Sequence, residues 1–407
     1  ITMNKRKYRL FVICCLVLDL LVMLISGYRY LDRKIPDEIQ ISRGKKTEDV
    51  TEVLSTPFVT FEEAVTVSQD GGYILPCKLL GYIPFKEIKV TPADDQEIYV
   101  SGSTIGIYMQ TEGVLVIDTG EIQNRNGETE EPARNIIRQG DYIISFNGEK
   151  ISTKRELIDD ISELDGSEVT LGISRKGESI PVSVTPVKDK KGDYKLGIWV
   201  RDDTQGIGTL TYVDQNGNYG ALGHGISDID TAQLLNIRNG ALYKARILAI
   251  NKGSKGNPGE LAGYICYDDR NILGTIEANS RNGIYGQFTG IVDDAITLKK
   301  MPAAYKQEVK IGTATILCST DGEVKEYDAE IRKIDLNHED TNKSFVIKVT
   351  DKELLEATGG IVQGLSGSPV IQNGKIIGAV THVFVQDASS GYGIFIENML
   401  KNTERLF

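Results

Sequence analysis

Short runs of strand-forming residues separated by glycine recur in the second half of the sequence, and they restrict the fold more than any other feature. The chain contains 42 glycines in 407 residues, together with many valines, isoleucines, threonines and tyrosines. β-Branched and aromatic residues favour strands, and glycine favours the tight turns between them. The clearest runs are residues 206–213, 245–250, 312–317, 345–349 and 375–385. The pattern predicts a mainly β chain with a β-barrel beyond about residue 195.

The composition indicates an acidic, folded protein of two or three domains. Of all residues 40% are hydrophobic and 25% are charged, and the formal net charge is −11. The length exceeds what one hydrophobic core usually serves. Because nucleic-acid binding needs a basic face that neutralises phosphates, we expect no nucleic-acid partner. The simplest interpretation of the acidity is solubility.

The N-terminal region has the pattern of a membrane segment. Residues 8–27 are mostly apolar, interrupted by Asp19, and four basic residues lie between positions 5 and 9. Twenty helical residues span about 30 Å, enough to cross a bilayer. The basic flank should stay in the cytoplasm, so the remaining chain should lie outside it. Residues 26–28 lack a small-x-small cleavage pattern. We therefore expect an uncleaved anchor, and a cleaved signal peptide is the alternative.

A serine turn occurs in the run Gly364-Leu365-Ser366-Gly367-Ser368-Pro369-Val370. This run resembles the signature around the nucleophile of chymotrypsin-like serine proteases. An oxyanion hole needs backbone N–H groups aimed at one point, and glycine allows the sharp turn that this requires. Ser366 would be the nucleophile, and the N–H groups of Gly364 and Ser366 would form the oxyanion hole. A simple turn between two strands is the alternative.

A serine hydroxyl needs a base, and the sequence offers three histidines. His224 lies between Gly223 and Gly225, which allow another backbone to approach closely, and it is the first candidate. His382 alternates with apolar residues of a strand, so a hydrogen-bonded histidine within a sheet is its simpler interpretation. His338 lies in a polar run that resembles a solvated loop. We therefore expect His224 to be the general base.

The residues alone do not select the carboxylate that would orient this histidine. Seven aspartates of the same region are available, namely Asp228, Asp230, Asp268, Asp269, Asp293, Asp294 and Asp351.

We expect no metal and no other cofactor. The five cysteines include no Cys-x-x-Cys pair, and His-Glu-x-x-His is absent. Cys77, Cys266 and Cys318 are isolated along the chain and fit the interpretation of small buried residues.

Residues 101–192 resemble a PDZ domain. Residues 140–148 form an Asp-led strand that ends in an Asn-Gly turn, and residues 154–161 have the apolar spacing of a helix. Such domains add a peptide strand to a sheet edge and bind the end of that peptide through backbone N–H groups. The loop expected to do this comprises Thr104, Ile105, Gly106 and Ile107. A β-sandwich that binds nothing is the alternative.

The chain also resembles the SpoIVB peptidases of endospore-forming bacteria. The matching stretches are residues 219–224, 226–228, 256–260, 358–369, 378–385 and 391–393. The resemblance implies a triad of His224, Asp351 and Ser366. Asp351 lies closer before the serine than in chymotrypsin-like enzymes. The order of anchor, PDZ module and peptidase also matches this family.

The expected fold class is mainly β, with an N-terminal transmembrane helix, a small β module, a PDZ domain and a chymotrypsin-like double β-barrel peptidase domain. Residues 28–56 are polar and indicate a mobile linker. The expected boundaries are 1–27 for the cytoplasmic flank and membrane anchor or signal, 28–56 for the linker, 57–100 for the β module, 101–192 for the PDZ domain and 193–407 for the peptidase domain.

The resemblance implies a membrane-anchored serine endopeptidase in the space between forespore and mother cell. It would cleave itself, with the linker as an apt site, and an extracytoplasmic part of a membrane protein that regulates an intramembrane protease. The cut would activate a late sigma factor. A general PDZ-containing quality-control protease and a non-enzymatic PDZ scaffold with a peptidase-like fold are the alternatives.

Overall fold

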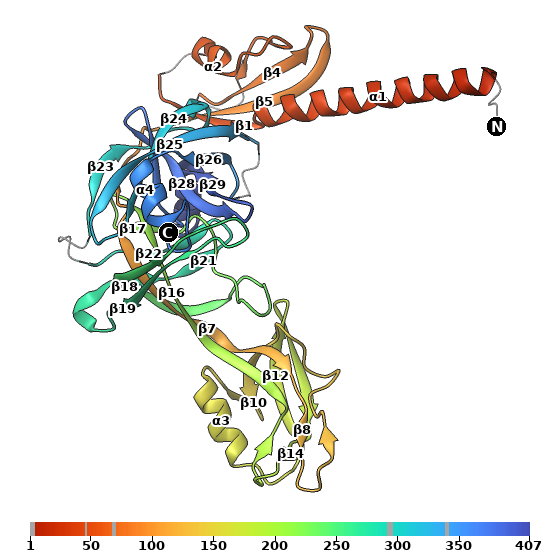
Figure 1. Ribbon diagram of the computed structural model, residues 1–407, viewed down its shortest axis with the longest axis vertical. Coiled ribbons are helices and arrows are strands. Elements are labelled where there is room, and N and C mark those ends of the chain that lie inside the picture. The colour runs from red at the N-terminus through yellow and green to blue at the C-terminus, as the bar shows by residue number, and fades with distance from the viewer. Residues whose placement is uncertain (1–4, 45–46, 67–70, 291–295, 338–341) are drawn as a thin grey trace.

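The computed structural model describes residues 5–44, 47–66, 71–290, 296–337 and 342–407. The chain is mainly β, which confirms the prediction, and Figure 1 shows three parts along its long axis. A long helix and a small sheet lie at one end, a β-barrel lies in the middle, and the expected PDZ module forms the other end. The candidates Asp293, Asp294 and His338 lie outside the described residues.

Helix α1 (Lys5–Lys34) contains the apolar N-terminal segment. Its part from Tyr8 to Lys34 is long and apolar enough to cross a membrane, and its most apolar stretch is fully exposed. The helix extends past residue 27, the expected end of the anchor. Its last turn differs from the rest because Leu31 is buried, together with Ile35, in the core of the small sheet.

The small sheet has the order β1-β5-β4-β2, and β3 also pairs with β4. β1 (Glu38–Ser42) pairs in parallel with β5, and α2 (Thr47–Leu54) follows it. Residues 28–56 therefore include packed elements, which differs from the mobile linker that their polar composition predicts. Their few apolar side chains, such as Ile39 and Val50, are buried in one core. The remaining strands are β2 (Val59–Phe61), β3 (Val65–Thr66), β4 (Tyr73–Leu79) and β5 (Ile83–Ala93).

The expected PDZ module is built from antiparallel strands and one helix, α3 (Lys154–Ser162). Helix α3 begins at a capping box, in which Thr153 and Glu156 each accept a backbone N–H of the other. Leu157 then points into a separate core with Val169 and Leu171. The strands are β8 (Ile122–Gln123), β9 (Thr129–Glu130), β10 (Tyr142–Phe146), β11 (Glu149–Lys150), β12 (Val169–Arg175), β13 (Glu178–Val184), β14 (Val187–Lys188) and β15 (Tyr194–Lys195).

Two long strands join this module to the rest of the molecule. β7 (Thr104–Thr119) and β16 (Ile198–Val213) each contain 16 residues. They pair antiparallel from Ile198 opposite Thr119 to Thr209 opposite Thr104. We call this pair the ribbon. One end of the ribbon belongs to the PDZ module and the other to the central part, as Figure 1 shows.

The central part contains a closed six-stranded barrel in the order β24-β25-β26-β29-β28-β27. Its bounds are β24 (Gly312–Ser319), β25 (Val324–Ile334), β26 (Phe345–Val349), β27 (Pro369–Gln372), β28 (Lys375–Phe384) and β29 (Asp387–Phe395). Helix α5 (Ile396–Leu406) follows β29 and packs against β28. Among the described residues, this is one closed barrel where the sequence predicts a double β-barrel.

The other half of the central part belongs to a 14-stranded sheet that includes the ribbon. Its further elements are β6 (Glu97–Val100), β17 (Asn218–Ala221), β18 (Ile237–Asn251), β19 (Glu260–Ile265), β20 (Ile272–Ile276), β21 (Ala278–Ser280), β22 (Gly283–Gln287), β23 (Lys299–Pro302) and the 3₁₀ turns Asp269–Asn271 and Lys306–Glu308. Helix α4 (Lys352–Thr358) precedes the serine turn.

Candidate active site

The serine turn lies where the barrel meets the ribbon. Gly364 and Gly367 have φ of +100° and +95°, which glycine adopts readily. A Cβ on Gly367 would lie 2.2 Å from the Thr209 carbonyl oxygen, so the close approach to β16 also requires glycine. β16 holds the turn through three hydrogen bonds. These run from the Thr209 N–H to the Ser366 carbonyl (3.0 Å), from Thr209 Oγ1 to the Gly364 carbonyl (2.8 Å) and from Thr211 Oγ1 to the Gly367 carbonyl (2.7 Å).

Two backbone N–H groups of this turn have no acceptor within the described part of the chain. The N–H groups of Leu365, Gly367 and Ser368 donate to the carbonyls of Val362, Val380 and Leu365. Those of Gly364 and Ser366 do not donate to any described residue. An oxyanion hole requires such free donors. The pair proposed from the sequence therefore has the necessary hydrogen-bonding capacity.

His224 follows β17 on a strained turn. Leu222 and Gly223 have φ of +67° and +66°. A Cβ on Gly223 would lie 2.9 Å from the Thr381 side chain of β28, so the His224 turn packs against the barrel. His224 Nδ1 lies 2.9 Å from the Gly225 carbonyl oxygen. Because a carbonyl only accepts, Nδ1 donates its proton and Nε2 keeps a free lone pair, which a general base requires.

His382 lies beside His224. The ring centroids are 4.8 Å apart and the planes are tilted by 37°. Burial and the neighbouring His224 and Lys343 lower the pKa of His382 to about 4. Its Nδ1 is buried without a hydrogen-bond partner among the described residues. The interpretation of a hydrogen-bonded sheet histidine therefore fails at this atom. Burial also lowers the pKa of His224, although the Gly225 carbonyl opposes the shift.

Ser366 lies close to this histidine pair through Thr381. Ser366 Oγ donates to the Thr381 carbonyl at 2.7 Å, and Thr381 directly precedes His382 in β28. The structure thus brings the serine turn, the His224 turn and His382 to one place.

Asp351 is not part of this group. It caps the N-terminus of α4, where one carboxylate oxygen accepts the Leu354 N–H at 3.0 Å and the other accepts the Asp328 N–H at 3.4 Å. Among the described residues it makes no hydrogen bond or ion pair with His224. The contact that the resemblance implies is therefore absent, because the cap fixes this carboxylate at the start of α4. Burial of Cys318 raises the pKa of its thiol to about 12, and the negative charges of Asp351 and Asp321 add to this shift.

Three of the other described candidate aspartates have arginine partners, and Asp269, in the 3₁₀ turn Asp269–Asn271, makes no side-chain hydrogen bond or ion pair with a described residue. Asp228 and Asp230 form ion pairs with Arg201, and Asp268 pairs with Arg270. Arg201 belongs to β16 near the PDZ module. The segment after His224 also contacts that module through the Gln139 amide, which donates to the Asp230 carbonyl at 3.0 Å, and the Tyr142 hydroxyl, which accepts the Asn236 N–H at 3.1 Å.

The residues expected to bind a peptide end do not form an open loop. Thr104, Ile105, Gly106 and Ile107 begin β7 and are buried. Ile105 and Ile107 pair with β16 on one side and with β18 on the other. No strand edge is left there for a peptide, so this expectation is corrected.

A groove between α3 and the start of β16 has the required form instead. The groove has a volume of ≈ 800 Å³. Ile158 and Trp199 contribute exposed apolar surface to it, and Gly197 has φ of +67°. At residues 198–201, β16 pairs with β7 on one edge. The sequence signal for this groove is Gly197 before the apolar residues 198–200, which lie beyond residue 192, the expected end of the PDZ domain.

The structure has a serine in a glycine-containing turn of a β-barrel, and the turn that carries His224 lies beside it. The same chain carries a module with an apolar groove. Together these features define the class of serine peptidases with an accessory PDZ domain. The chain belongs to the SpoIVB peptidase S55 family, whose model matches residues 192–400. A PDZ domain model matches residues 103–185.

Individual relatives are more distant. "Putative zinc metalloprotease LL2128" of Lactococcus lactis is 38% identical over 78 residues, which cover 18% of this chain and 18% of that protein. The PDZ domain of the SdrC-like protein of Listeria monocytogenes is 23% identical over 22% of this chain and 87% of that chain, with a TM-score of 0.19. The active form of the Rv3671c protease from M. tuberculosis is 14% identical over 50% and 74%, with a TM-score of 0.25.

Proposed function

We propose that this chain is a membrane-anchored serine endopeptidase that acts outside the cytoplasm. Ser366 is the nucleophile, His224 is the general base, and the N–H groups of Gly364 and Ser366 bind the oxyanion. The observation that carries this proposal is the common packing of the serine turn and the His224 turn against Thr381. Helix α1 is the anchor, with its basic N-terminal flank in the cytoplasm.

The reaction follows from these groups. Rotation about the Cα–Cβ bond of Ser366 would replace the hydrogen bond to Thr381 by one to His224 Nε2. Oγ then attacks the peptide carbonyl carbon while Nε2 takes its proton, and the oxyanion forms between the two free N–H groups. Collapse breaks the C–N bond, and the amine leaves with the proton from Nε2. Water hydrolyses the acyl-enzyme by the same proton transfers in reverse.

Asp351 has a positioning role in this proposal. It starts α4, and α4 ends at Thr358, directly before Gly359, Gly360 and the serine turn. Thr358 Oγ1 donates to the Gly360 carbonyl at 2.5 Å. A fixed α4 therefore fixes the entry to the turn. The third group beside His224 is the neutral His382 ring, which packs against it.

We further propose that the substrate is an extracytoplasmic part of a membrane protein, and that a peptide binds between α3 and β16. By family resemblance, the substrate regulates an intramembrane protease, and its cleavage activates a late sigma factor in the space between forespore and mother cell. Self-cleavage within residues 28–56 would require local unfolding, because β1 is a strand of the small sheet and α2 packs into the same core.

The test uses the full chain in detergent and a fluorophosphonate probe. An activated serine displaces fluoride from the probe and gains its mass. We expect labelling at Ser366, and self-cleavage fragments by intact mass, in the natural sequence. Both should disappear in Ser366→Ala.

Ser368→Ala is the matched control. Ser368 lies two positions away, and its buried hydroxyl has no hydrogen-bond partner in the described structure. This change therefore removes a hydroxyl group without removing a hydrogen bond. In this variant the probe should label Ser366 as it does in the natural sequence. Labelling that survives Ser366→Ala, or that occurs at another residue, contradicts the proposal.

A further inference from the structure

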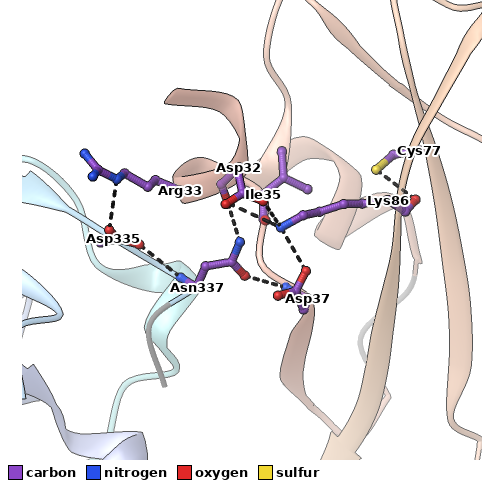
Figure 2. Close-up of polar contacts among 8 residues, drawn as sticks. All are labelled: Asp32, Arg33, Ile35, Asp37, Cys77, Lys86, Asp335 and Asn337. Atoms are coloured by element: carbon purple, nitrogen blue, oxygen red, sulfur yellow. Dashed lines mark hydrogen bonds and ion pairs between the residues drawn. The ribbon is translucent and has the colours of Figure 1, made fainter. Parts of the chain in front are cut away.

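The C-terminal end of α1 is held to the folded part of the chain on two sides, as Figure 2 shows. Lys86 of the small sheet forms ion pairs with Asp32 (2.7 Å) and Asp37 (2.8 Å). On the other side, Arg33 pairs with Asp335 at 3.4 Å, and the Asn337 amide donates to the Asp32 carbonyl. The last turn of α1 therefore holds the barrel at a defined distance from the apolar part of the helix.

A cleft of ≈ 780 Å³ lies between this end of α1 and the barrel. Among the described residues that line it, six are basic and none is acidic. They are Arg29, Arg33 and Lys34 of α1, Lys310 just before the barrel strand β24, and Arg332 and Lys333 of β25. Exposed apolar surface from Val53 and Ile311 adjoins them, and Ile311 is 64% exposed.

Three of these basic residues have neither a carboxylate nor an aromatic partner among the described residues. Arg33 and Arg332 pair with Asp335 and Glu330, and Lys34 lies over the Tyr30 ring. Arg29, Lys310 and Lys333 have no carboxylate partner among the described residues. Such a concentration is unusual in a chain with a net charge of −11. Basic residues on the extracytoplasmic side of a membrane helix oppose the positive-inside rule that orients the helix. Their presence therefore indicates a role other than orientation.

The depth of the cleft matches the lipid headgroups. If residues 8–27 fill the hydrocarbon core, Arg29 and Lys34 lie about 3 and 10 Å beyond its edge along the helix. The headgroup layer occupies roughly 5–8 Å on each side of that core, so Arg29 lies within it and the Lys34 backbone lies just outside it. Cations at this level meet lipid phosphates, and exposed apolar side chains beside them meet the edge of the acyl chains.

We propose that this cleft binds anionic phospholipid headgroups of the bilayer that α1 crosses. The proposal rests on the membrane anchoring proposed above and is independent of catalysis. Lipid phosphates would neutralise Arg29, Lys310 and Lys333 together, which would hold the barrel, and with it the serine turn, against the membrane surface.

The test is lipid competition on the full chain. The protein is reconstituted in nanodiscs of equal phosphatidylglycerol and phosphatidylcholine, and the lipids retained after transfer to detergent are counted by native mass spectrometry. We expect phosphatidylglycerol to be retained at least tenfold over phosphatidylcholine. Removal of one basic residue near a membrane should weaken binding about fivefold, so the triple variant Arg29→Gln, Lys310→Gln, Lys333→Gln should lose the preference.

The matched control is Lys150→Gln, Lys176→Gln, Lys255→Gln, which removes three exposed lysines that have no ion-pair partner among the described residues and lie far along the chain from the cleft residues. It should keep the preference. Equal retention of both lipids, or a preference that survives the triple variant, overturns the proposal. Displacement of the lipid by millimolar inorganic phosphate would identify a soluble anion as the occupant and would also overturn it. Failure of the proposed membrane anchoring would give a different result from failure of lipid binding, because the protein would then not insert into nanodiscs of either lipid.

Discussion

At the scale of single residues, the candidate site differs from a triad with a carboxylate. His224 donates Nδ1–H to a backbone carbonyl, and its other neighbour is the ring of His382. No aspartate contacts either ring within the described residues. A carboxylate would favour the charged imidazolium, whereas a buried neutral neighbour does not. The neutral base should therefore persist to a lower pH than in an exposed histidine.

The pH dependence of the reaction follows from this environment. Burial lowers the pKa of His224 from 6.5, and only the neutral form takes a proton. We expect the rate of probe labelling to rise with pH through a midpoint below 6.5 and to be flat from there to pH 8. His382→Ala exposes the His224 ring, so the midpoint should move up toward 6.5 and the maximal rate should fall roughly tenfold. A midpoint above 7 in the natural sequence would exclude this environment for the base.

Two substitutions of Asp351 distinguish a helix-capping role of this carboxylate from a catalytic role. Asparagine caps a helix as well as aspartate does, whereas alanine costs about 1 kcal/mol. We expect Asp351→Asn to keep the labelling rate within about threefold, and Asp351→Ala to lose about 1 kcal/mol in the free energy of unfolding and much of the rate. Urea denaturation and labelling rates measure both. A loss of about 10⁴-fold in the asparagine variant, the size seen when a triad aspartate is replaced, would return Asp351 to a direct catalytic role.

At the scale of elements, β16 has two tasks. Its first residues line the groove against α3, and its Thr209 and Thr211 hold the serine turn. The proposed peptide groove and the proposed oxyanion-hole backbone therefore contact opposite ends of the same strand.

The groove can be tested with the single tryptophan of the chain. Trp199 is 69% exposed and lies at the groove. A peptide with an apolar C-terminal residue and a free carboxylate should change the Trp199 emission saturably, and its C-terminally amidated form should bind at least tenfold more weakly. Ile158→Asp should abolish binding, because it places a charge in the apolar groove.

Val385→Asp is the control for that charge, since Val385 is an equally exposed apolar residue of the peptidase part. An unchanged titration in Ile158→Asp would mean that the peptide binds elsewhere.

At the scale of the whole molecule, the PDZ module rests on the segment that follows His224. Arg201 of β16 reaches Asp228, whose side chain is almost fully buried. Gln139 and Tyr142 of the module contact the same segment. The two parts therefore share an interface next to the candidate base.

This interface should contribute measurably to stability. Arg201→Gln leaves the buried Asp228 carboxylate with only its backbone donors, so the free energy of unfolding should fall by about 1–3 kcal/mol. Arg270→Gln removes an exposed pair with Asp268, which solvent screens, and should change the stability less than Arg201→Gln does. Urea denaturation of both variants gives the comparison. Equal losses would show that the Arg201 pair has no special role.

Much of the architecture could be predicted from the sequence, because its signals are local. Glycine-separated runs of valine, isoleucine and threonine predict strands and turns, the apolar run predicts α1, and the sequence around Ser366 predicts a tight glycine turn. Each depends on residues that are neighbours in the chain. The role of His224 as a turn residue between glycines is of the same kind.

Tertiary packing decided the rest. Thr104–Ile107 look like an exposed loop but pair on both edges once β18 lies beside β7. The polar segment 28–56 becomes ordered because its few apolar side chains find partners in strands that come later in the chain. The neighbour of His224 is His382, which is 158 positions away, and Asp351 is held by its own helix. Which distant side chains meet depends on strand pairing and burial across the whole chain, and no local pattern encodes it.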